Sequence, residues 1–154
     1  MSDDLAQLTG EIQRLKDIEE IKQLKAHYCR CVDTKDWDTY ATLVTDDLTL
    51  QTDGGLQEGR DTVVASLTRS LATATTVHQV HVAEITVDGD SAQAIFPMQD
   101  YVNMTFGDKT FTIRGFGHYH EDYQRTGDGW KLRRSQLIRR HVDTEGELPT
   151  APQS

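Results

Sequence analysis

The periodicity of apolar residues changes near Thr75, and this change constrains the fold more than any other feature of the sequence. Before Thr75, apolar residues recur every three or four positions, which is the period of an amphipathic helix. After it, apolar and polar residues alternate and β-branched residues become common, which is typical of strands. Helices followed by antiparallel strands predict an α+β domain, with the helices packed on one face of a curled sheet. The 154 residues suffice for one such domain.

Three helical segments are predicted before Thr75. The first begins at Ile12 and carries one apolar stripe, formed by Leu15, Ile18, Ile21, Leu24, Tyr28 and Val32. Its solvent-facing side is expected to hold Lys16, Glu19, Lys22 and Lys25. The stripe ends at residues 33–36, where short polar side chains favour a break and a new helix cap. A shorter helix follows with Trp37, Tyr40, Ala41 and Val44, and a third opens at Gly59-Arg60-Asp61 with Val64, Leu67 and Leu71 on one face.

The strand region is predicted to consist of two hairpins. Strands Thr76–Val87 and Ser91–Met104 flank Asp88-Gly89-Asp90, which is a strong signal for a tight turn. Strands Phe111–Arg125 and Trp130–Val142 flank a second glycine-containing turn at residues 126–129. We therefore expect a single domain over residues 11–143, a flexible N-terminus at residues 1–10 and a flexible tail at residues 144–154.

Composition and charge exclude several classes of function. Acidic residues outnumber basic ones by 25 to 16, which gives a formal net charge of −9. This field repels phosphate backbones and anionic lipid, so neither nucleic acid nor a membrane is an expected partner. The apolar runs are shorter than the ~20 residues of a spanning helix, and residues 1–10 lack the basic and apolar parts of a secretory signal. Cys29 and Cys31 do not make a disulfide framework, and a cytoplasmic location is expected.

Asp33 and His78 are polar residues at positions where the apolar periodicity predicts residues of the core. Asp33 falls at the C-terminal end of the first helix, where the helix dipole disfavours a carboxylate that has no compensating partner. One interpretation is that Asp33 caps the next helix, although Asp36 competes for that role. His78 shares a predicted strand face with Val80 and Val82 and is either a structural residue or a base. A buried histidine beside a carboxylate is the arrangement of a general base.

Asp100 interrupts an apolar row on the strand Ser91–Met104. The other members of this row are Ala92, Ala94, Phe96, Met98, Val102 and Met104. A charge on the core face of a strand must pair, become protonated or line a cavity. Arg114 and Arg139 are possible counter-ions, and the periodicity leaves open whether Arg139 or Arg140 points inward. A bulge or edge position at Pro97, which would change the strand phase, is the alternative.

His118 and His120 are two residues apart on a predicted strand and therefore share one face. They could form half of a metal site, but Glu121 and His141 do not have the spacing that would complete a cupin-type set. We therefore predict no metal and expect this pair to line a pocket or to pair across strands. The alternating Gly115 and Gly117 indicate either a sharp bend of the sheet or a close approach to its backbone, as a sheet curled around a cavity requires.

The order of elements and several stretches together resemble the SnoaL-like family of the nuclear transport factor 2-like superfamily. The matching stretches are residues 18–33 with Asp36-Trp37, Gly59-Arg60-Asp61, residues 77–90, residues 115–121 and residues 130–139. The resemblance implies a cone-shaped α+β fold of the cystatin-like type, with three N-terminal helices packed on a curled antiparallel sheet and an apolar pocket at the open end. It also implies a homodimer or homotrimer associated through the outer face of the sheet.

The resemblance further implies a cofactor-independent lyase of the scytalone dehydratase and bile acid dehydratase type. Asp33 and His78 match the positions of the family's catalytic aspartate–histidine dyad, and Tyr28 matches a pocket tyrosine. The residues expected to bind a hydrophobic cyclic substrate, polyketide-like or steroid-like, are Asp100, Arg139, Trp37, His118, His120, Phe96 and Met98. Two alternatives stay open because this fold hosts many functions. They are an isomerase or cyclase with the same proton abstraction, and a non-catalytic protein that binds a small ligand.

Overall fold

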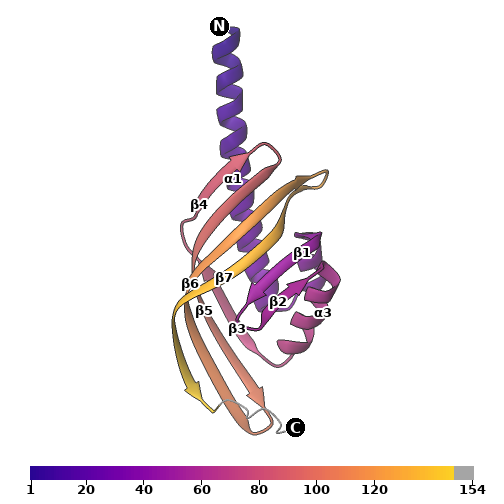
Figure 1. Ribbon diagram of the computed structural model, residues 1–154, viewed down its shortest axis with the longest axis vertical. Coiled ribbons are helices and arrows are strands. Elements are labelled where there is room, and N and C mark those ends of the chain that lie inside the picture. The colour runs from indigo at the N-terminus through magenta and orange to yellow at the C-terminus, as the bar shows by residue number, and fades with distance from the viewer. Residues whose placement is uncertain (148–154) are drawn as a thin grey trace.

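The helices and strands follow one another in the order that the sequence predicts, with one additional hairpin between the second and third helices (Figure 1). A computed structural model describes residues 1–147. Its elements are α1 (Ser2–Thr34), α2 (Trp37–Thr42), β1 (Val44–Thr52), β2 (Gly55–Glu58), α3 (Arg60–Ser70), β3 (Thr75–Val80), β4 (Glu84–Asp88), β5 (Ser91–Phe106), β6 (Lys109–Thr126) and β7 (Gly129–Gly146). The α+β architecture is therefore confirmed.

The seven strands form one curled sheet in the order β2-β1-β7-β6-β5-β3, with β4 also paired to β5. The turns at 88–90 and 126–129 connect antiparallel neighbours as predicted. The β1–β2 hairpin is an element that the sequence analysis missed, and β1 pairs with β7 in parallel. The sheet is therefore mixed rather than purely antiparallel. The lower part of α1 crosses one face of this sheet, and α3 lies beside β1 and β2 (Figure 1).

The predicted strand Thr76–Val87 is divided into β3 and β4, which pair with successive parts of β5. Pro97 of β5 explains the break, because proline has no backbone N–H to donate to a neighbouring strand. The carbonyl of Pro97 accepts a hydrogen bond from the backbone N–H of His81 at 2.9 Å. The nitrogen of Pro97 therefore faces the same edge of β5 as its carbonyl. At this point of that edge β3 has ended and β4 has not begun.

The core lies between α1 and the concave face of the sheet. Alternate residues of β5 and β6 point toward the helix, including Phe96 opposite Tyr119 and Met98 opposite Gly117. The helix contributes Ile21, Tyr28, Cys29 and Val32 to the same core. Burial of these side chains supplies the main favourable free energy of folding, at roughly 25 cal/mol per Å² of apolar surface.

The structure corrects two expectations for α1, the start of its buried stripe and the direction of Lys25. The helix begins at Ser2, so residues 2–10, expected to form a flexible N-terminus, are helical. Ile12 and Leu15, the expected start of the buried stripe, are 50% and 58% exposed because the sheet does not reach them. Lys25, expected in solvent, is 1% exposed because the crossing of helix and sheet turns it inward.

At the other end, β7 continues to Gly146, beyond the predicted boundary at residue 143. Of the tail predicted at residues 144–154, residues 148–154 lie outside the described residues. Among residues 1–147, no helix is both long and apolar enough to cross a membrane.

Candidate functional site

The side chains of Asp33 and His78 are in direct contact. Asp33 Oδ1 lies 2.7 Å from His78 Nδ1, and Asp33 Oδ2 accepts the backbone N–H of His78 at 2.9 Å. The hydroxyl of Thr76 donates to Asp33 Oδ1 at 2.9 Å. A carboxylate that already accepts these bonds requires a proton on Nδ1, which leaves Nε2 of a neutral imidazole as an acceptor. The arrangement is therefore that of a general base held in one tautomer.

The local sequence explains why Asp33 is available for this contact. Residue Lys35 ends α1 in the left-handed conformation, with φ of 58°. Asp36 caps α2 by accepting a hydrogen bond from the backbone N–H of Thr39 at 3.1 Å. Of the two candidate caps, Asp36 therefore takes this role and Asp33 does not. Burial raises the pKa of Asp33, but the hydrogen bonds from His78 and Thr76 outweigh it and lower the pKa below 3.8. Asp33 is therefore ionised at neutral pH.

A groove of about 570 Å³ lies beside the dyad, between α1 and the edge strand β3. It is lined by Ala26, Cys29, Arg30, Asp33, His78, Gln79, Val80 and His81. His78 keeps 17% and Asp33 23% of its side chain exposed. Within residues 1–147, no protein group makes a hydrogen bond to Nε2 of His78. A molecule in this groove could therefore reach the free nitrogen of the base.

A second charged group lies next to His78 on the concave face. Asp100 is the strand partner of His78 and forms a bidentate pair with Arg139, with both N–O distances at 2.9 Å. Arg139 also donates to Asp53 in the β1–β2 turn. Arg139 rather than Arg140 points inward because β7 is bulged, so that Arg140 has no partner in the register. The predicted partner of Asp100 is therefore Arg139, and Asp53 joins the pair.

Gly115 makes room for this ion pair. A Cβ atom on Gly115 would overlap Nη1 of Arg139 and Oδ1 of Asp100. The glycine predicted to mark close approach on the sheet therefore lies under the charged pair.

Tyr28 is buried and does not line the groove beside the dyad. Its hydroxyl group is hydrogen-bonded to the hydroxyl group of Tyr40, with the two oxygen atoms 3.2 Å apart. Burial is the main reason why the pKa of Tyr28 is raised well above 10.0. Tyr28 is thus a neutral hydrogen-bond donor within the core.

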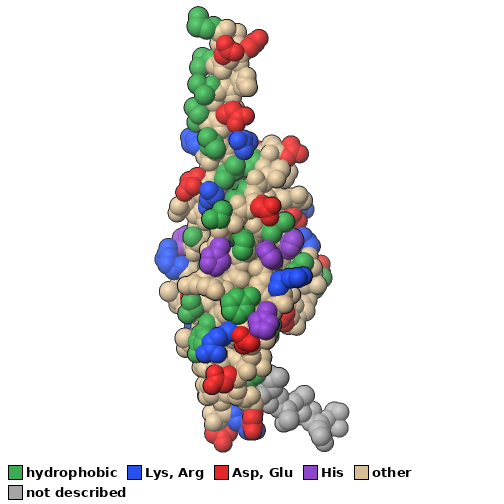
Figure 2. Space-filling model, turned by 90° about the vertical axis from the view of Figure 1, so that its left-hand side faces the viewer, with side chains coloured by type: hydrophobic (Ala, Val, Ile, Leu, Met, Phe, Trp, Pro, Cys, Tyr) green, Lys and Arg blue, Asp and Glu red, His purple; other side chains and the backbone are tan. Residues whose placement is uncertain are grey.

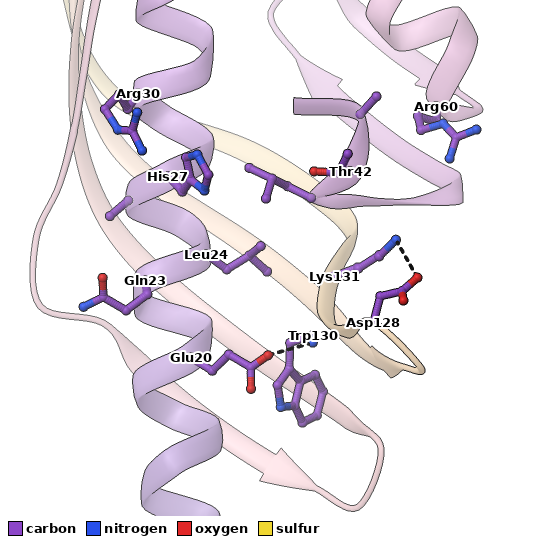
Figure 3. A pocket seen from close by; sticks show the side chains of 13 residues that line it. Glu20, Gln23, Leu24, His27, Arg30, Thr42, Arg60, Asp128, Trp130 and Lys131 are labelled. Atoms are coloured by element: carbon purple, nitrogen blue, oxygen red, sulfur yellow. Dashed lines mark hydrogen bonds and ion pairs between the residues drawn. The ribbon is translucent and has the colours of Figure 1, made fainter. Parts of the chain in front are cut away.

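A larger hollow also borders α1, away from the dyad (Figure 3). This groove of about 1080 Å³ runs between α1 and the β6–β7 hairpin. Polar side chains such as Glu20, His27, Arg30 and Lys131 line it together with the apolar Leu24 and Trp130 (Figure 3). Only Ala26 and Arg30 border both grooves. The dyad is therefore served by the smaller groove.

The structure separates the remaining predicted residues. His118 and His120 lie opposite Pro97 and Ile95 in the register and point away from the concave face, so the structure places neither histidine beside the dyad. The spacing of two residues predicts that both side chains lie on the same face of the strand, but it does not predict which face of the sheet that is. Trp37 packs edge-on against Tyr40, and Phe96 and Met98 are core residues of the concave face. Residues 1–147 contain no cluster of three metal-ligating side chains.

Three residues at or near the site were not anticipated. The sequence does not single out Thr76, because a threonine is ordinary in the strand predicted there. It does not single out Arg30 either, because an arginine is ordinary on the exposed face of a helix. Asp53 could have been found, since Leu48 and Leu50 alternate with polar residues and predict a strand before its turn.

Residues 13–136 match the SnoaL-like domain family. The chain belongs to this family. The resemblance drawn from the sequence is therefore confirmed, and with it the expected kind of fold.

Solved structures similar to this SnoaL-like protein show the same fold. A nuclear transport factor 2-like protein with a cystatin-like fold from Novosphingobium aromaticivorans is 26% identical, with a TM-score of 0.67 over 88% of this chain and 89% of that chain. A hexachlorocyclohexane dehydrochlorinase of type 2 is 19% identical, with a TM-score of 0.76 over 92% and 97%. A candidate scytalone dehydratase from N. aromaticivorans is 18% identical, with a TM-score of 0.73 over 84% and 88%. These similarities show a shared fold.

Proposed function

We propose that this SnoaL-like protein is a cofactor-independent lyase, of the dehydratase type, with His78 as its general base. The observation that carries this proposal is the contact of 2.7 Å between His78 Nδ1 and Asp33 beside an open groove. The names of two similar structures, a dehydrochlorinase and a candidate scytalone dehydratase, denote elimination reactions and support this choice over a binding function.

The proposed reaction begins with proton transfer to His78. Nε2 takes a proton from the carbon next to a carbonyl, and the electrons of that C–H bond form an enolate. Asp33 stabilises the imidazolium through the Nδ1–H bond. The enolate then re-forms its carbonyl, a C=C bond forms, and the C–O bond to the β-hydroxyl breaks. The leaving oxygen takes the proton from Nε2, so the net change is loss of one water.

The wall of the groove suggests the class of substrate. Cys29 and Val80 offer apolar surface, whereas Arg30 and Gln79 offer hydrogen-bond donors. This combination suits a hydrophobic cyclic ketone with a hydroxyl group β to the carbonyl, its oxygen held by a donor as charge develops. Tyr28, whose hydroxyl group is bonded to that of Tyr40, would provide that donor only for a substrate that reaches the core.

Two assays on cyclic β-hydroxy ketones test the proposal. One follows loss of water by mass spectrometry, and the other follows exchange of the α-proton in D₂O, which reports proton abstraction even without elimination. His78→Ala is expected to lower both rates by roughly 10²–10⁴, which is the usual contribution of a general base. Asp33→Asn is expected to lower them by about 10², because the tautomer is no longer fixed.

The chain offers a matched control in a second histidine–aspartate pair. His141 Nε2 and Asp143 Oδ1 are 3.0 Å apart on the exposed part of β7. His141→Ala and Asp143→Asn should leave both rates unchanged, because this pair borders neither groove. Full turnover in both dyad variants would refute the proposal. Exchange without loss of water would instead favour an isomerase.

A further inference from the structure

Residues 2–16 of α1 extend beyond the body of the protein and are exposed along their whole length (Figure 1). Four large apolar side chains in this segment are open to solvent: Leu5 at 65%, Leu8 at 57%, Ile12 at 50% and Leu15 at 58%. Figure 2 shows hydrophobic side chains in a row along one side of the protruding helix. We call Leu5, Leu8, Ile12 and Leu15 the N-terminal stripe.

The protein's own body cannot cover the N-terminal stripe. At about 100° per residue, the stripe is centred roughly 160° around the helix from the face that α1 buries with Ile21, Tyr28 and Val32. An exposed apolar row of this regularity therefore marks an interaction surface.

The spacing within the stripe identifies the kind of partner. The steps of three, four and three residues are those of coiled-coil positions a and d, with Leu5 and Ile12 at a and Leu8 and Leu15 at d. Position a holds Ile12 in one heptad and Leu5 in the other, and isoleucine at a with leucine at d favours two parallel strands. The stripe therefore fits a second helix of the same kind.

Charges beside the stripe favour a second copy in parallel orientation. Glu11 occupies position g and Lys16 the following position e, which face each other across a parallel pair. An antiparallel pair would instead bring Asp4 and Glu11, both acidic and at position g, together. A lipid surface fits poorly, because interfacial helices carry Lys and Arg on the polar face, whereas this one begins with Asp3 and Asp4.

We propose that two copies of this chain associate through their N-terminal stripes as a short parallel coiled coil. The bodies then lie side by side at one end of the pair, because the buried face of each α1 points away from the seam. The dyad lies near the other end of α1, at Asp33, so this proposal is independent of the proposed function.

Sedimentation equilibrium of the full chain, from micromolar to sub-millimolar concentration, tests the association. The wild type should show a monomer–dimer equilibrium, and Leu8→Glu with Ile12→Glu should be monomeric throughout. The matched control is Ala6→Glu with Gln7→Glu, which adds the same charge at the outward positions b and c and should still dimerise. Circular dichroism and urea unfolding verify that each variant is folded.

A monomeric wild type would overturn the proposal, and so would a dimer that survives Leu8→Glu with Ile12→Glu. If that monomer bound vesicles of phosphatidylcholine and phosphatidylserine, the stripe would belong to a lipid surface. A surviving dimer would place the interface elsewhere, for example on the outer face of the sheet.

The orientation has its own test. Oxidised Leu8→Cys should form a disulfide-linked homodimer, because a parallel pair places the two d residues opposite each other. The wild type is the control, since Cys29 and Cys31 are buried. Preferential cross-linking of Leu8→Cys to Ile12→Cys would contradict the parallel arrangement. Glu11→Lys should weaken the dimer, and Glu11→Lys with Lys16→Glu should restore it.

Discussion

At the scale of single residues, the least expected feature is a buried lysine. Lys25 Nζ lies 2.5 Å from Glu121 Oε1, and it also lies 4.2 Å and 4.0 Å from the ring centres of Tyr28 and Tyr119. Glu121 further accepts hydrogen bonds from Ser135, at 2.8 Å, and Tyr123. The periodicity of α1 gave no sign of this, because a lysine at the margin of an apolar stripe ordinarily extends to solvent. The side chain of Lys25 turns inward because it pairs with Glu121, which is 96 residues away in the sequence.

Loss of Lys25 alone should destabilise the protein strongly. Lys25→Met leaves Glu121 buried without its counter-ion, so we expect the free energy of unfolding to fall by about 3–5 kcal/mol. Adding Glu121→Met should recover part of this loss, because the uncompensated charge is then removed. Urea unfolding monitored by circular dichroism measures both variants. Lys22→Met, on the exposed side of the same helix, should change stability by less than about 0.5 kcal/mol. Equal effects at Lys22 and Lys25 would contradict the role given to the buried pair.

At the scale of elements, the sequence predicted what depends on local chemistry and missed what depends on pairing. The two hairpin turns and the cap at Asp36 follow from glycine and aspartate at fixed positions. The direction of the Arg139 side chain does not follow from local sequence, because it is set by a bulge that forms only when β7 pairs with β6. The β1–β2 hairpin was also missed, because its short apolar pattern follows a helical one without a clear break.

The packing of β6 under the Asp100–Arg139 pair gives a prediction at this scale. Gly115→Ala should destabilise the protein by about 1–3 kcal/mol, because the added methyl group overlaps the ion pair and must displace it. Differential scanning calorimetry measures the change. Gly127→Ala is the control, since nothing lies within 4 Å of a Cβ atom at that turn and its φ is not in the left-handed region. If both substitutions are equally tolerated, the pair is not held as tightly as its bidentate geometry indicates.

At the scale of the whole molecule, three charged residues eight positions apart join α1 to the sheet. Asp17 pairs with Arg125 of β6, Lys25 with Glu121 of β6, and Asp33 with His78 of β3. The helix crosses the sheet obliquely, so positions that a straight amphipathic pattern assigns to different sides all find partners. Only the contact of Asp33 was foreseen from the sequence, through the family resemblance. The other two depend on residues about one hundred positions away, and no local period encodes them.

The contact at Asp17 should control stability in acid. Two hydrogen bonds from Arg125, each 2.8 Å long, are the main reason why the pKa of Asp17 is lowered, despite burial; Trp130 Nε1 adds a third at 3.1 Å. A carboxyl group whose pKa is lower in the folded than in the unfolded state stabilises the fold above the unfolded value of 3.8, and this stabilisation is lost as the pH falls through the folded value.

Asp17→Asn removes this dependence on pH. The variant should be less stable than the wild type by about 2 kcal/mol at neutral pH, which is typical for hydrogen bonds to a charged group. This difference should shrink once the pH falls below about 4, because the wild type loses its advantage as Asp17 takes up a proton. Urea midpoints measured from about pH 7 to about pH 3 follow the difference, with Asp108→Asn in the exposed β5–β6 turn as the control. A constant difference at every pH would mean that Asp17 acts through packing rather than charge, and that this end of α1 is held to the sheet by Trp130 and its apolar neighbours.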